Sequence, residues 1–429
     1  MIPALFLPCA QGVEPLLVDE LQRLPGLAGA RVESWRGGVV VHANQVDEVP
    51  VLAMHCNLES RLAQRVLWPL AFGAYRSEHD LYELARTVDW RLWITPQQTL
   101  KVDITATRSP LQSLNFAVLR IKDAVCDVLR EATGERPSVD TRRPDLPLLL
   151  HLTVEDATLY VDTSGEALFK RGWRVDKGEA PLKETLAAAM LAAAGWQGRA
   201  EDGPLLDPCC GAGTIAIEAA QLACGIAPGL QRRFAFERLA PFRGALPQWQ
   251  RIKQAARSRA HAPAVAVHAG DVSFRMTDFA TRNAERAGVR HAIEFKTADA
   301  LQRTPPAESG TLMLNPPYGE RIEPKGRGTA GRAPREAFEG GAGPAEFFAQ
   351  LASHWKKHYP GWTAWVLSPD AKLPSQMRLK ESRRVPLWNG PIECRLFRFD
   401  LVAGSLRRVA ADDGAGAGAP PNDQAPETR

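Results

Sequence analysis

The sequence has few cysteines and no CxxC pair. Its 429 residues contain seven cysteines, an odd number, and none has the spacing of zinc ligands. This pattern excludes a disulfide framework, predicts no metal and favours a reducing compartment. The longest stretch of small apolar residues, Leu186 to Trp196, falls well short of the ~20 residues of a membrane span. Because the first residues also lack the basic start of a secretion signal, we expect a soluble cytoplasmic protein.

The sequence also has only a small excess of positive over negative residues. The chain has 53 Lys+Arg and 49 Asp+Glu, a net charge of +4, which excludes both a polybasic histone-like binder and an acidic solvating protein. Only 12 of the basic residues are lysine and 41 are arginine. Arginine forks onto phosphate and stacks on bases. A GC-rich genome is the simpler explanation of this bias.

The first 165 residues mix short strands and helices, which is typical of an α+β module. Hydrophobic periodicity gives the elements. We expect strands at 2–8, 37–43 and 99–107, helices at 16–24, 61–72, 81–88 and 119–132, and a hairpin over 146–165.

After about residue 180 the pattern alternates between strand and helix. This alternation predicts an α/β fold with a parallel, doubly wound sheet, whose ligand lies beyond the carboxyl ends of the strands. A helix at 182–196 comes first, and the expected strands are 204–206, 264–267, 292–296, 311–314 and 362–367.

A glycine-rich turn, DPCCGAGT, joins the first of these strands to a helix. Gly211 and Gly213 let the backbone approach a ligand closely, and the helix that follows offers free N–H groups. The turn lacks the third glycine of a dinucleotide fingerprint and the GK[ST] of a P-loop, which argues against NAD and ATP. Cys209 and Cys210 are best explained as packing residues. Taken alone, the turn could equally bind nothing.

Two acidic residues follow later strands of the predicted sheet. Asp271 ends the segment AVAVHAGD, where a carboxylate can accept hydrogen bonds from both ribose hydroxyls. Asp299 follows IEFKT and could accept from an adenine amino group. In isolation, Asp271 could as well be a helix N-cap and Asp299 the cap of a turn.

The most informative motif is Asn315-Pro316-Pro317-Tyr318, directly after an apolar strand. Consecutive prolines keep Pro316 out of a helical conformation, so its carbonyl can point out of the turn beside the Asn315 side chain. Two acceptors aimed at one point suit an NH₂ group, and Tyr318 can stack on the ring that carries it. Such acceptors strengthen as positive charge develops on the nitrogen. The alternative is a Pro-rich exit loop with a chance aromatic.

Together these motifs resemble a known family. DPCCGAGT, Asp271, Asp299 and NPPYGER are similar to motifs I to IV of class I S-adenosylmethionine-dependent amino-methyltransferases. Residues 164–191, NPPYGERI and the segment LWNGPIECRLF at 387–397 resemble the bacterial THUMP-domain methyltransferases that modify guanine N2 of 23S ribosomal RNA. The resemblance covers residues 1 to about 402.

The resemblance implies a Rossmann-like fold with a mostly parallel seven-stranded sheet. It implies a ferredoxin-like segment at 1–55, an RNA-binding THUMP domain at 56–165, a methyltransferase domain at 166–402 and a disordered tail at 403–429. S-adenosylmethionine (SAM) would be the cofactor, and 23S rRNA or an assembling large ribosomal subunit the partner. Residues 180–184 would close the cofactor pocket, although a plain helix start with solvated Lys183 and Glu184 is the alternative. The cofactor-binding residues implied are Asp207, Pro208, Cys210, Gly211, Gly213, Thr214, Asp271, Asp299 and Asn315; the catalytic residues are Asn315, Pro316, Pro317 and Tyr318.

Several alternatives stay open at this stage. A tRNA guanine-N2 methyltransferase shares the THUMP domain and NPPY, and a DNA adenine-N6 methyltransferase shares NPPY alone. A non-catalytic RNA-binding or ribosome-assembly factor could retain the fold. Arg378, Lys380, Arg383 and Arg384 are either a solvated face or phosphate contacts.

Three departures from the family pattern are visible. Ser273 stands where relatives often have a second acidic residue, so Asp271 is the only carboxylate expected for the ribose. A Gly-rich insertion at 323–343 reads as a mobile loop. The chain ends after one methyltransferase domain, whereas some relatives continue into a second, so only the first activity is expected.

Overall fold

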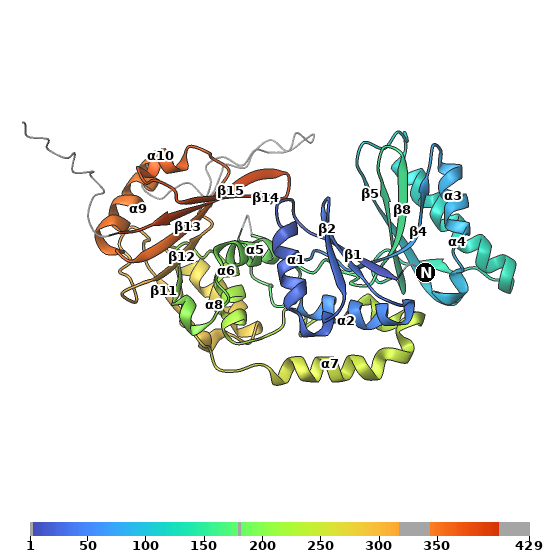
Figure 1. Ribbon diagram of the computed structural model, residues 1–429, viewed down its shortest axis with the longest axis horizontal. Helices are drawn as coiled ribbons and strands as arrows, with labels where there is room; N and C mark the ends of the chain where they lie inside the picture. The colour runs from blue at the N-terminus through green and yellow to red at the C-terminus, as the bar shows by residue number, and fades with distance from the viewer. Residues whose placement is uncertain (1–2, 179–181, 317–343, 403–429) are drawn as a thin grey trace, which may run out of the picture.

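The computed structural model describes residues 3–178, 182–316 and 344–402. These residues form two β-sheets, one in each half of the molecule (Figure 1). The expectations for Pro317, Tyr318, the insertion at 323–343 and the tail at 403–429 lie outside the described residues. None of the described helices is long and apolar enough to cross a membrane.

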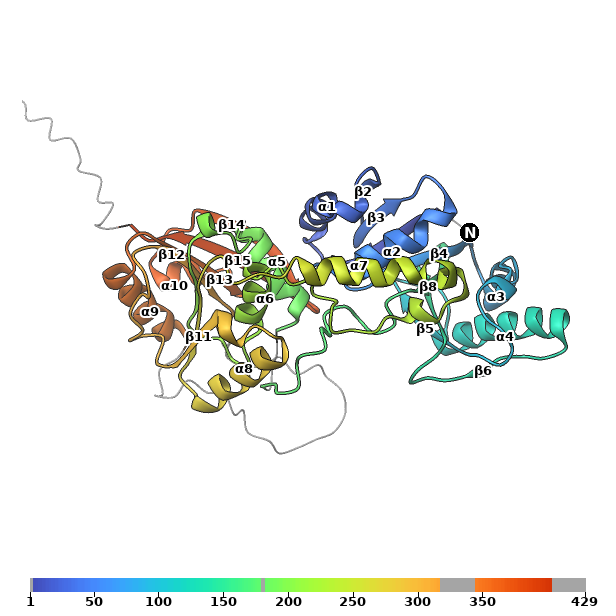
Figure 2. The same ribbon diagram turned by 90° about the horizontal axis from the view of Figure 1, so that it is seen from below.

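The first sheet has eight strands in the order β2-β3-β1-β4-β8-β7-β5-β6. The helices α3 and α4 pack against each other, α3 on β4 and α4 on β5, on the side that faces away from the other half of the molecule (Figures 1 and 2). The strands are β1 (Ala4–Pro8), β2 (Arg31–Trp35), β3 (Gly38–His42), β4 (Leu67–Ala74), β5 (Thr99–Ala106), β6 (Ser138–Val139), β7 (Leu146–Leu152) and β8 (Asp156–Asp162). The helices are α1 (Glu14–Arg23), α2 (Val49–Glu59), α3 (Glu78–Arg86) and α4 (Leu114–Thr133).

The helix expected at 61–72 was wrong. Residues from Leu67 onward form β4, which pairs antiparallel with β8, and the helix lies earlier, as α2. Pro69 explains the error, because a proline inside a helix removes a hydrogen bond and clashes with the preceding turn. In β4 the register shifts between Pro69 and Ala71, and such an irregularity tolerates proline.

Only part of the apolar run in α4 faces the core. Ile121, Ala124 and Val125 are buried, but Leu119 is 48% exposed. The helix turns Ala117 and Leu129 toward the core instead. The buried stripe is therefore narrower than the run of apolar residues in the sequence.

The second sheet has seven strands in the order β11-β10-β9-β12-β13-β15-β14. The strands β11, β10, β9, β12 and β13 are parallel to one another. β15 lies between β13 and β14 and runs antiparallel to both. This mostly parallel sheet confirms the expected fold class. From β9 the chain proceeds outward to β10 and β11, then returns to the other side of β9 with β12. This reversal makes a switch point, where ligands bind in open α/β sheets. The strands are β9 (Leu205–Asp207), β10 (Val267–Asp271), β11 (Ile293–Thr297), β12 (Gly310–Leu314), β13 (Trp362–Ser368), β14 (Arg383–Asn389) and β15 (Ile392–Asp400).

Helices cover the second sheet. They are α5 (Glu184–Ala194), α6 (Thr214–Ala223), α8 (Phe274–Arg286), α9 (Pro344–His358) and α10 (Leu373–Met377). The connection from α6 to β10, residues 224–266, is unusually long and is called the strap below. It contains two 3₁₀ turns and α7 (Leu246–Ser258), which lies along the edge of the molecule and reaches the N-terminal half (Figures 1 and 2).

Aromatic residues join the strap to the N-terminal half. Within the strap, Phe236 stacks on Phe242 and packs edge-on against Trp249. Phe242 packs edge-on against Trp68 of β4, with the ring centroids 5.9 Å apart. Trp68 in turn packs against Trp93. The two halves therefore share one continuous hydrophobic core.

A buried ion-pair cluster also joins the halves. Glu218 of α6 is fully buried and accepts from Arg171 Nε at 3.0 Å and from Arg61 Nη1 at 3.2 Å. Arg171 also donates to the carbonyl of Arg61 at 2.7 Å. Because Arg61 belongs to the N-terminal half and Glu218 to the other, the cluster ties them together.

Candidate functional site

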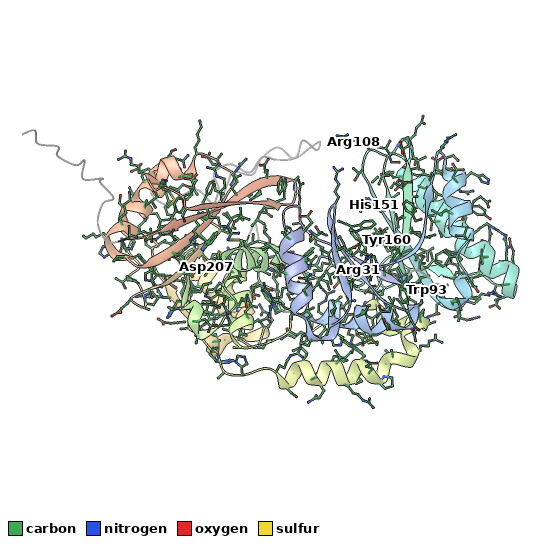
Figure 3. All side chains as sticks on the ribbon, viewed as in Figure 1. Arg31, Trp93, Arg108, His151, Tyr160 and Asp207 are labelled. Atoms are coloured by element: carbon green, nitrogen blue, oxygen red, sulfur yellow. The ribbon has the colours of Figure 1, made fainter. Side chains whose placement is uncertain are left out.

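Polar side chains gather at the carboxyl ends of the parallel strands. Asp207 and Asp271 are the last residues of β9 and β10, and Asn315 follows β12 directly. In register, Asp207 lies beside Ala269 of β10, so the ends of β9 and β10 meet at the same edge of the sheet. The structure thus brings three residues predicted from separate motifs to the same edge of the sheet at the switch point. This edge, together with the glycine turn, is called the crevice below. Asp207 is labelled in Figure 3.

The glycine turn is bonded to the end of β10. Cys210 donates its backbone N–H to the carbonyl of Gly270 at 2.8 Å, and Gly211 donates to Asp271 Oδ2 at 3.0 Å. Gly213 has φ = 88°, and a Cβ there would lie 2.9 Å from Cβ of Ala280 in α8. The turn therefore requires glycine at position 213, both for its backbone conformation and for its close contact with α8.

The crevice is acidic and partly buried. Asp207 is 1% exposed, and burial, reinforced by the nearby charge of Asp271, raises the pKa of its carboxyl well above the usual value. Its hydrogen-bond partner is the backbone N–H of Cys209 at 3.3 Å, and no basic side chain among the described residues pairs with it. Burial also raises the pKa of Asp271, although the N–H groups of Ser273 and Gly211 oppose that shift. An ionised Asp207 would be stabilised by a cationic ligand in this crevice.

Asp271, Asp299 and Thr214 also have structural roles. Asp271 Oδ1 accepts from the N–H of Ser273, and Asp299 Oδ1 caps its own turn by accepting from the N–H of Leu301 at 2.9 Å. The hydroxyl oxygen of Thr214 accepts a hydrogen bond from Arg174 Nη2 at 2.8 Å. Of the remaining predicted residues in the turn, Pro208 and Cys210 are buried.

Arg174 is a contributor that the sequence analysis missed. Its Nε donates to Glu184 Oε1 at 2.7 Å, and its Nη2 reaches both Thr214 and the carbonyl of Leu182. Glu184 is 3% exposed, so the alternative in which it is solvated is wrong. Lys183 is exposed, with its ammonium 5.2 Å from the ring of Phe169. No spacing rule in the sequence links Arg174 to Thr214, forty residues later.

Asn283 is a second missed residue. It is fully buried in α8, and its Nδ2 donates to the carbonyl of Ala212 at 3.0 Å and to that of Asp176 at 2.8 Å. Its Oδ1 accepts from the N–H groups of Val175 and Asp176. The segment before α5 is thereby fixed to the glycine turn. The sequence did not indicate this role, because an asparagine inside an amphipathic helix is usually a solvent-facing residue.

The NPPY motif is described only in its first half. Asn315 is partly exposed and Pro316 is buried beside the end of β12, whereas Pro317 and Tyr318 lie outside the described residues. The four basic residues predicted to contact RNA are exposed: Arg378 ends α10, Lys380 follows it, and Arg383 and Arg384 begin the edge strand β14. Arg384 pairs with Glu381 at 2.6 Å.

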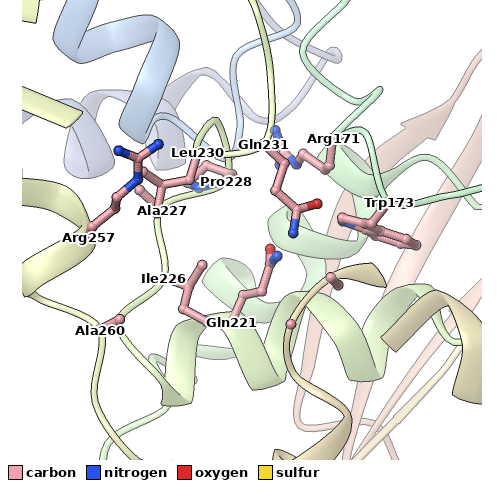
Figure 4. Close-up of a pocket in the computed structure, with 12 residues that line it drawn as sticks. Arg171, Trp173, Gln221, Ile226, Ala227, Pro228, Leu230, Gln231, Arg257 and Ala260 are labelled. Atoms are coloured by element: carbon pink, nitrogen blue, oxygen red, sulfur yellow. The ribbon is translucent and has the colours of Figure 1, made fainter. Parts of the chain in front are cut away.

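A cavity of about 230 Å³ lies elsewhere, near the far end of α6 (Figure 4). Trp173, Gln221 and Ile226 line it, together with residues of the strap and the end of α8. The glycine turn is at the opposite end of α6, so this cavity is separate from the crevice. The described residues contain no group of three or more His, Cys, Asp or Glu side chains that could hold a metal ion.

Three family models match successive parts of the chain. Residues 4–67 match the RlmL ferredoxin-like domain, residues 75–162 the THUMP domain and residues 171–330 the RMKL-like methyltransferase domain. The last match contains the glycine turn, both crevice aspartates and the NPPY motif. Residues 171–330 therefore match a methyltransferase domain, which follows matches to a ferredoxin-like domain and a THUMP domain. Position 55, the expected end of the first domain, falls within α2.

Curated relatives and solved structures agree with these domain matches. The ribosomal RNA large subunit methyltransferase K/L of Shewanella baltica (strain OS185) is 39% identical over 83% of this chain and 48% of its own length. The corresponding protein of Shewanella amazonensis is 36% identical over 96% of this chain and 55% of its own. The chain therefore spans about half the length of these curated relatives.

Solved structures with a similar fold include a Listeria monocytogenes protein described as an N6-adenine-specific DNA methylase. It is 26% identical, with a TM-score of 0.76 over 92% of this chain and 95% of its own. SMU.472, described as a methyltransferase and crystallised with SAH, shares the fold at 24% identity. Its TM-score is 0.78 over 94% of this chain and 99% of its own.

Proposed function

We propose that this chain transfers a methyl group from SAM to the exocyclic N2 of a guanine in 23S ribosomal RNA. The observation that carries the proposal is the crevice at the switch point, where the buried Asp207 and the partly buried Asp271 end β9 and β10 and Asn315-Pro316 follows β12. The large-subunit rRNA methyltransferase relatives support the choice of rRNA. Such a substrate would place the enzyme in the cytoplasm.

The residues of the crevice fit SAM. This cofactor carries a sulfonium and an ammonium, and Asp207 is a buried carboxylate without a basic partner among the described residues. Asp271 already accepts one backbone N–H on each oxygen, which fixes the carboxylate and leaves one lone pair on each oxygen for a ribose hydroxyl. Asp299 keeps one oxygen for the adenine amino group, because its other oxygen caps the turn.

The chemistry of methyl transfer explains the need for Asn315 and Pro316. Bound SAM supplies a methyl group that is electrophilic because its carbon is attached to a sulfonium. The guanine amine is a poor nucleophile, since its lone pair is delocalised into the ring. The Asn315 side chain and the Pro316 carbonyl would each accept a hydrogen bond from one N–H of the guanine amine. These two bonds would orient the lone pair of the amine nitrogen toward the methyl carbon. As the N–C bond forms and the S–C bond breaks, these acceptors stabilise the positive charge on nitrogen, and a proton then leaves to solvent.

The target base must leave its stack before it reaches the crevice. We propose that Tyr318 stacks on the unstacked guanine and that Pro317 holds the backbone of that turn. Arg378, Lys380, Arg383 and Arg384, exposed near the edge strand β14, would contact phosphate. The THUMP domain would bind flanking RNA.

The decisive experiment compares RNA from cells with and without the protein. Mass spectrometry of digested ribosomal and transfer RNA from a deletion strain should show loss of N2-methylguanosine from 23S rRNA, restored by the wild-type gene. Loss from tRNA alone would assign the chain to tRNA instead, and loss of methyladenine from DNA would favour the activity named for the Listeria relative.

The Asn315→Ala variant tests the mechanism. We expect methyl transfer to fall at least a hundredfold, because the variant lacks an acceptor that strengthens in the transition state. RNA and SAM should still bind, measured by fluorescence anisotropy and calorimetry. Turnover like that of the wild type would refute this role.

A further inference from the structure

The positive charge of this chain is concentrated in the strap. Residues 232–261 contain eight arginines and lysines and one acidic residue, Glu237, a net charge of +7. The whole chain carries +4, so the other residues together carry −3. A local surplus of this size creates a positive field that the small overall charge conceals.

Three of these arginines have structural partners. Arg259 pairs with Glu59 at 2.5 Å, and Arg238 donates to the carbonyl of Pro144 at 2.7 Å. Arg232 donates to the carbonyls of Glu166 and Ala167. These contacts attach the strap to the rest of the molecule.

The other five basic side chains have no carboxylate partner among the described residues. Four of them are exposed, and the fifth, Lys253, lies with its ammonium 4.9 Å from the ring of Trp249. Because no carboxylate neutralises these charges locally, their positive potential extends into the solvent around the helix and the turns before it. The five are Arg233, Arg243, Arg251, Lys253 and Arg257.

Helix α7 presents this charge in a fixed direction. Trp249, Ile252 and Ala256, at helical spacing, are buried against the N-terminal half. Arg251 and Arg257 are exposed on the remaining surface. With 13 residues, α7 extends about 20 Å along the edge of the molecule (Figure 1).

The composition of this surface favours a polyanion over a protein or a membrane. None of the large exposed hydrophobic residues of the described chain lies within 232–261. Protein interfaces have an apolar centre, and membrane-surface helices have an apolar face turned to the lipid. Here the apolar face of α7 is already buried, and the outer face offers arginine forks that match phosphate geometry.

We infer that the outer surface of the strap binds the phosphate backbone of RNA. This inference rests on the proposed function, because it assigns a second contact to the same RNA substrate. Helix α6 begins at the glycine turn and the strap follows its far end, so the start of the strap and the crevice lie at opposite ends of this helix. RNA that contacts both must therefore reach past α6, which has 10 residues and is about 15 Å long.

The test removes three unpaired charges from the full-length protein. The variant carries Arg243→Ala, Arg251→Ala and Arg257→Ala. The matched control carries Arg23→Ala, Arg31→Ala and Arg199→Ala, three exposed arginines outside the THUMP domain that are each paired with a nearby acid. Both lose the same total charge. Binding to a fluorescently labelled RNA duplex is measured by anisotropy over a series of KCl concentrations.

We expect the strap variant to bind the duplex at least tenfold more weakly at about 0.1 M salt. The plot of log association constant against log [salt] has a negative slope. Its magnitude should decrease by about 2 to 3, since each lost phosphate contact removes about 0.9. The control should bind like the wild type, and all three proteins should have the same affinity for SAM by calorimetry.

The outcomes separate the two proposals. If the wild type binds RNA with a steep salt dependence and the strap variant does the same, the strap inference is wrong and the proposed function stands. If the wild type binds no RNA, the proposed function itself fails. Equal losses in the strap variant and the control would show that only total charge matters, which also overturns the inference.

Discussion

At the scale of single residues, Asp207 shows how the crevice is prepared for a cation. Its carboxyl is buried, its pKa is raised, and it has one backbone N–H as a partner. In the protein without ligand, ionising this group costs free energy. Within the pH range between the usual pKa of 3.8 and the raised value, the folded state holds the proton more tightly than the unfolded state. Stability contributed by this group is therefore lost as pH rises through that range.

The Asp207→Asn variant tests this cost. At neutral pH the ligand-free variant should unfold about 2 °C or more above the wild type, and the difference should vanish below the usual pKa. Its affinity for SAM should fall about tenfold, because the negative charge is absent. Thermal unfolding between acid and neutral pH, with calorimetry for SAM, measures both effects.

Asp140→Asn is the matched control for Asp207→Asn. Asp140 is partly exposed, and backbone N–H groups of Arg143 and Arg142 lower its pKa. The amide should therefore leave neutral-pH stability unchanged or slightly lower it. A ligand-free Asp207→Asn protein less stable than the wild type at neutral pH would contradict the account of Asp207.

At the scale of elements, the glycine turn depends on two neighbouring helices. Gly213 begins α6 with a positive φ and touches Ala280 of α8. Asn283 of α8 holds the carbonyl of Ala212, and Arg174 holds the hydroxyl of Thr214. The turn is thus shaped by contacts from α8 and from the segment before α5, not by its own sequence alone.

Replacing each glycine by alanine separates backbone strain from packing. Gly213→Ala adds a Cβ at 2.9 Å from Ala280 and should lower the free energy of unfolding by about 2 to 3 kcal/mol. Gly211→Ala, at φ = 50° with no atom near its Cβ, should lower it by about 1 kcal/mol. Urea unfolding followed by tryptophan fluorescence gives both values. Equal losses would mean that the contact with α8 is unimportant.

At the scale of the whole molecule, the two halves form one unit. Arg171 lies at the centre of their junction, where it contacts Glu218 of α6 and the carbonyl of Arg61. The strap adds the aromatic contact between Phe242 and Trp68. An RNA held by the N-terminal half would therefore have a fixed position relative to the crevice.

Arg171→Ala should break this junction. Glu218 would remain buried with one charged partner fewer, and loss of one partner of a buried pair costs about 3 to 5 kcal/mol. We expect a correspondingly lower urea midpoint. Arg199→Ala, which removes an exposed pair, should cost at most about 1 kcal/mol. If the two variants unfold alike, the buried cluster does not hold the halves together.

Much of the fold was visible in the sequence, because apolar periodicity reports local structure directly. The parallel strands were placed within a few residues of their observed positions. The strand β4 was mistaken for a helix, since its pattern is irregular around Pro69 and only its pairing with β8 makes it a strand.

The sequence by itself determined the order of elements and the residues that follow each parallel strand, because strand ends are marked by local turn chemistry. The convergence of Asp207, Asp271 and Asn315 follows from that order once the sheet is parallel. Only the tertiary structure decided the roles of Arg174, Asn283 and Arg171, which act on partners distant in the chain. It also decided that the strap carries its apolar face inward and its charge outward, since burial depends on the surface against which a helix packs.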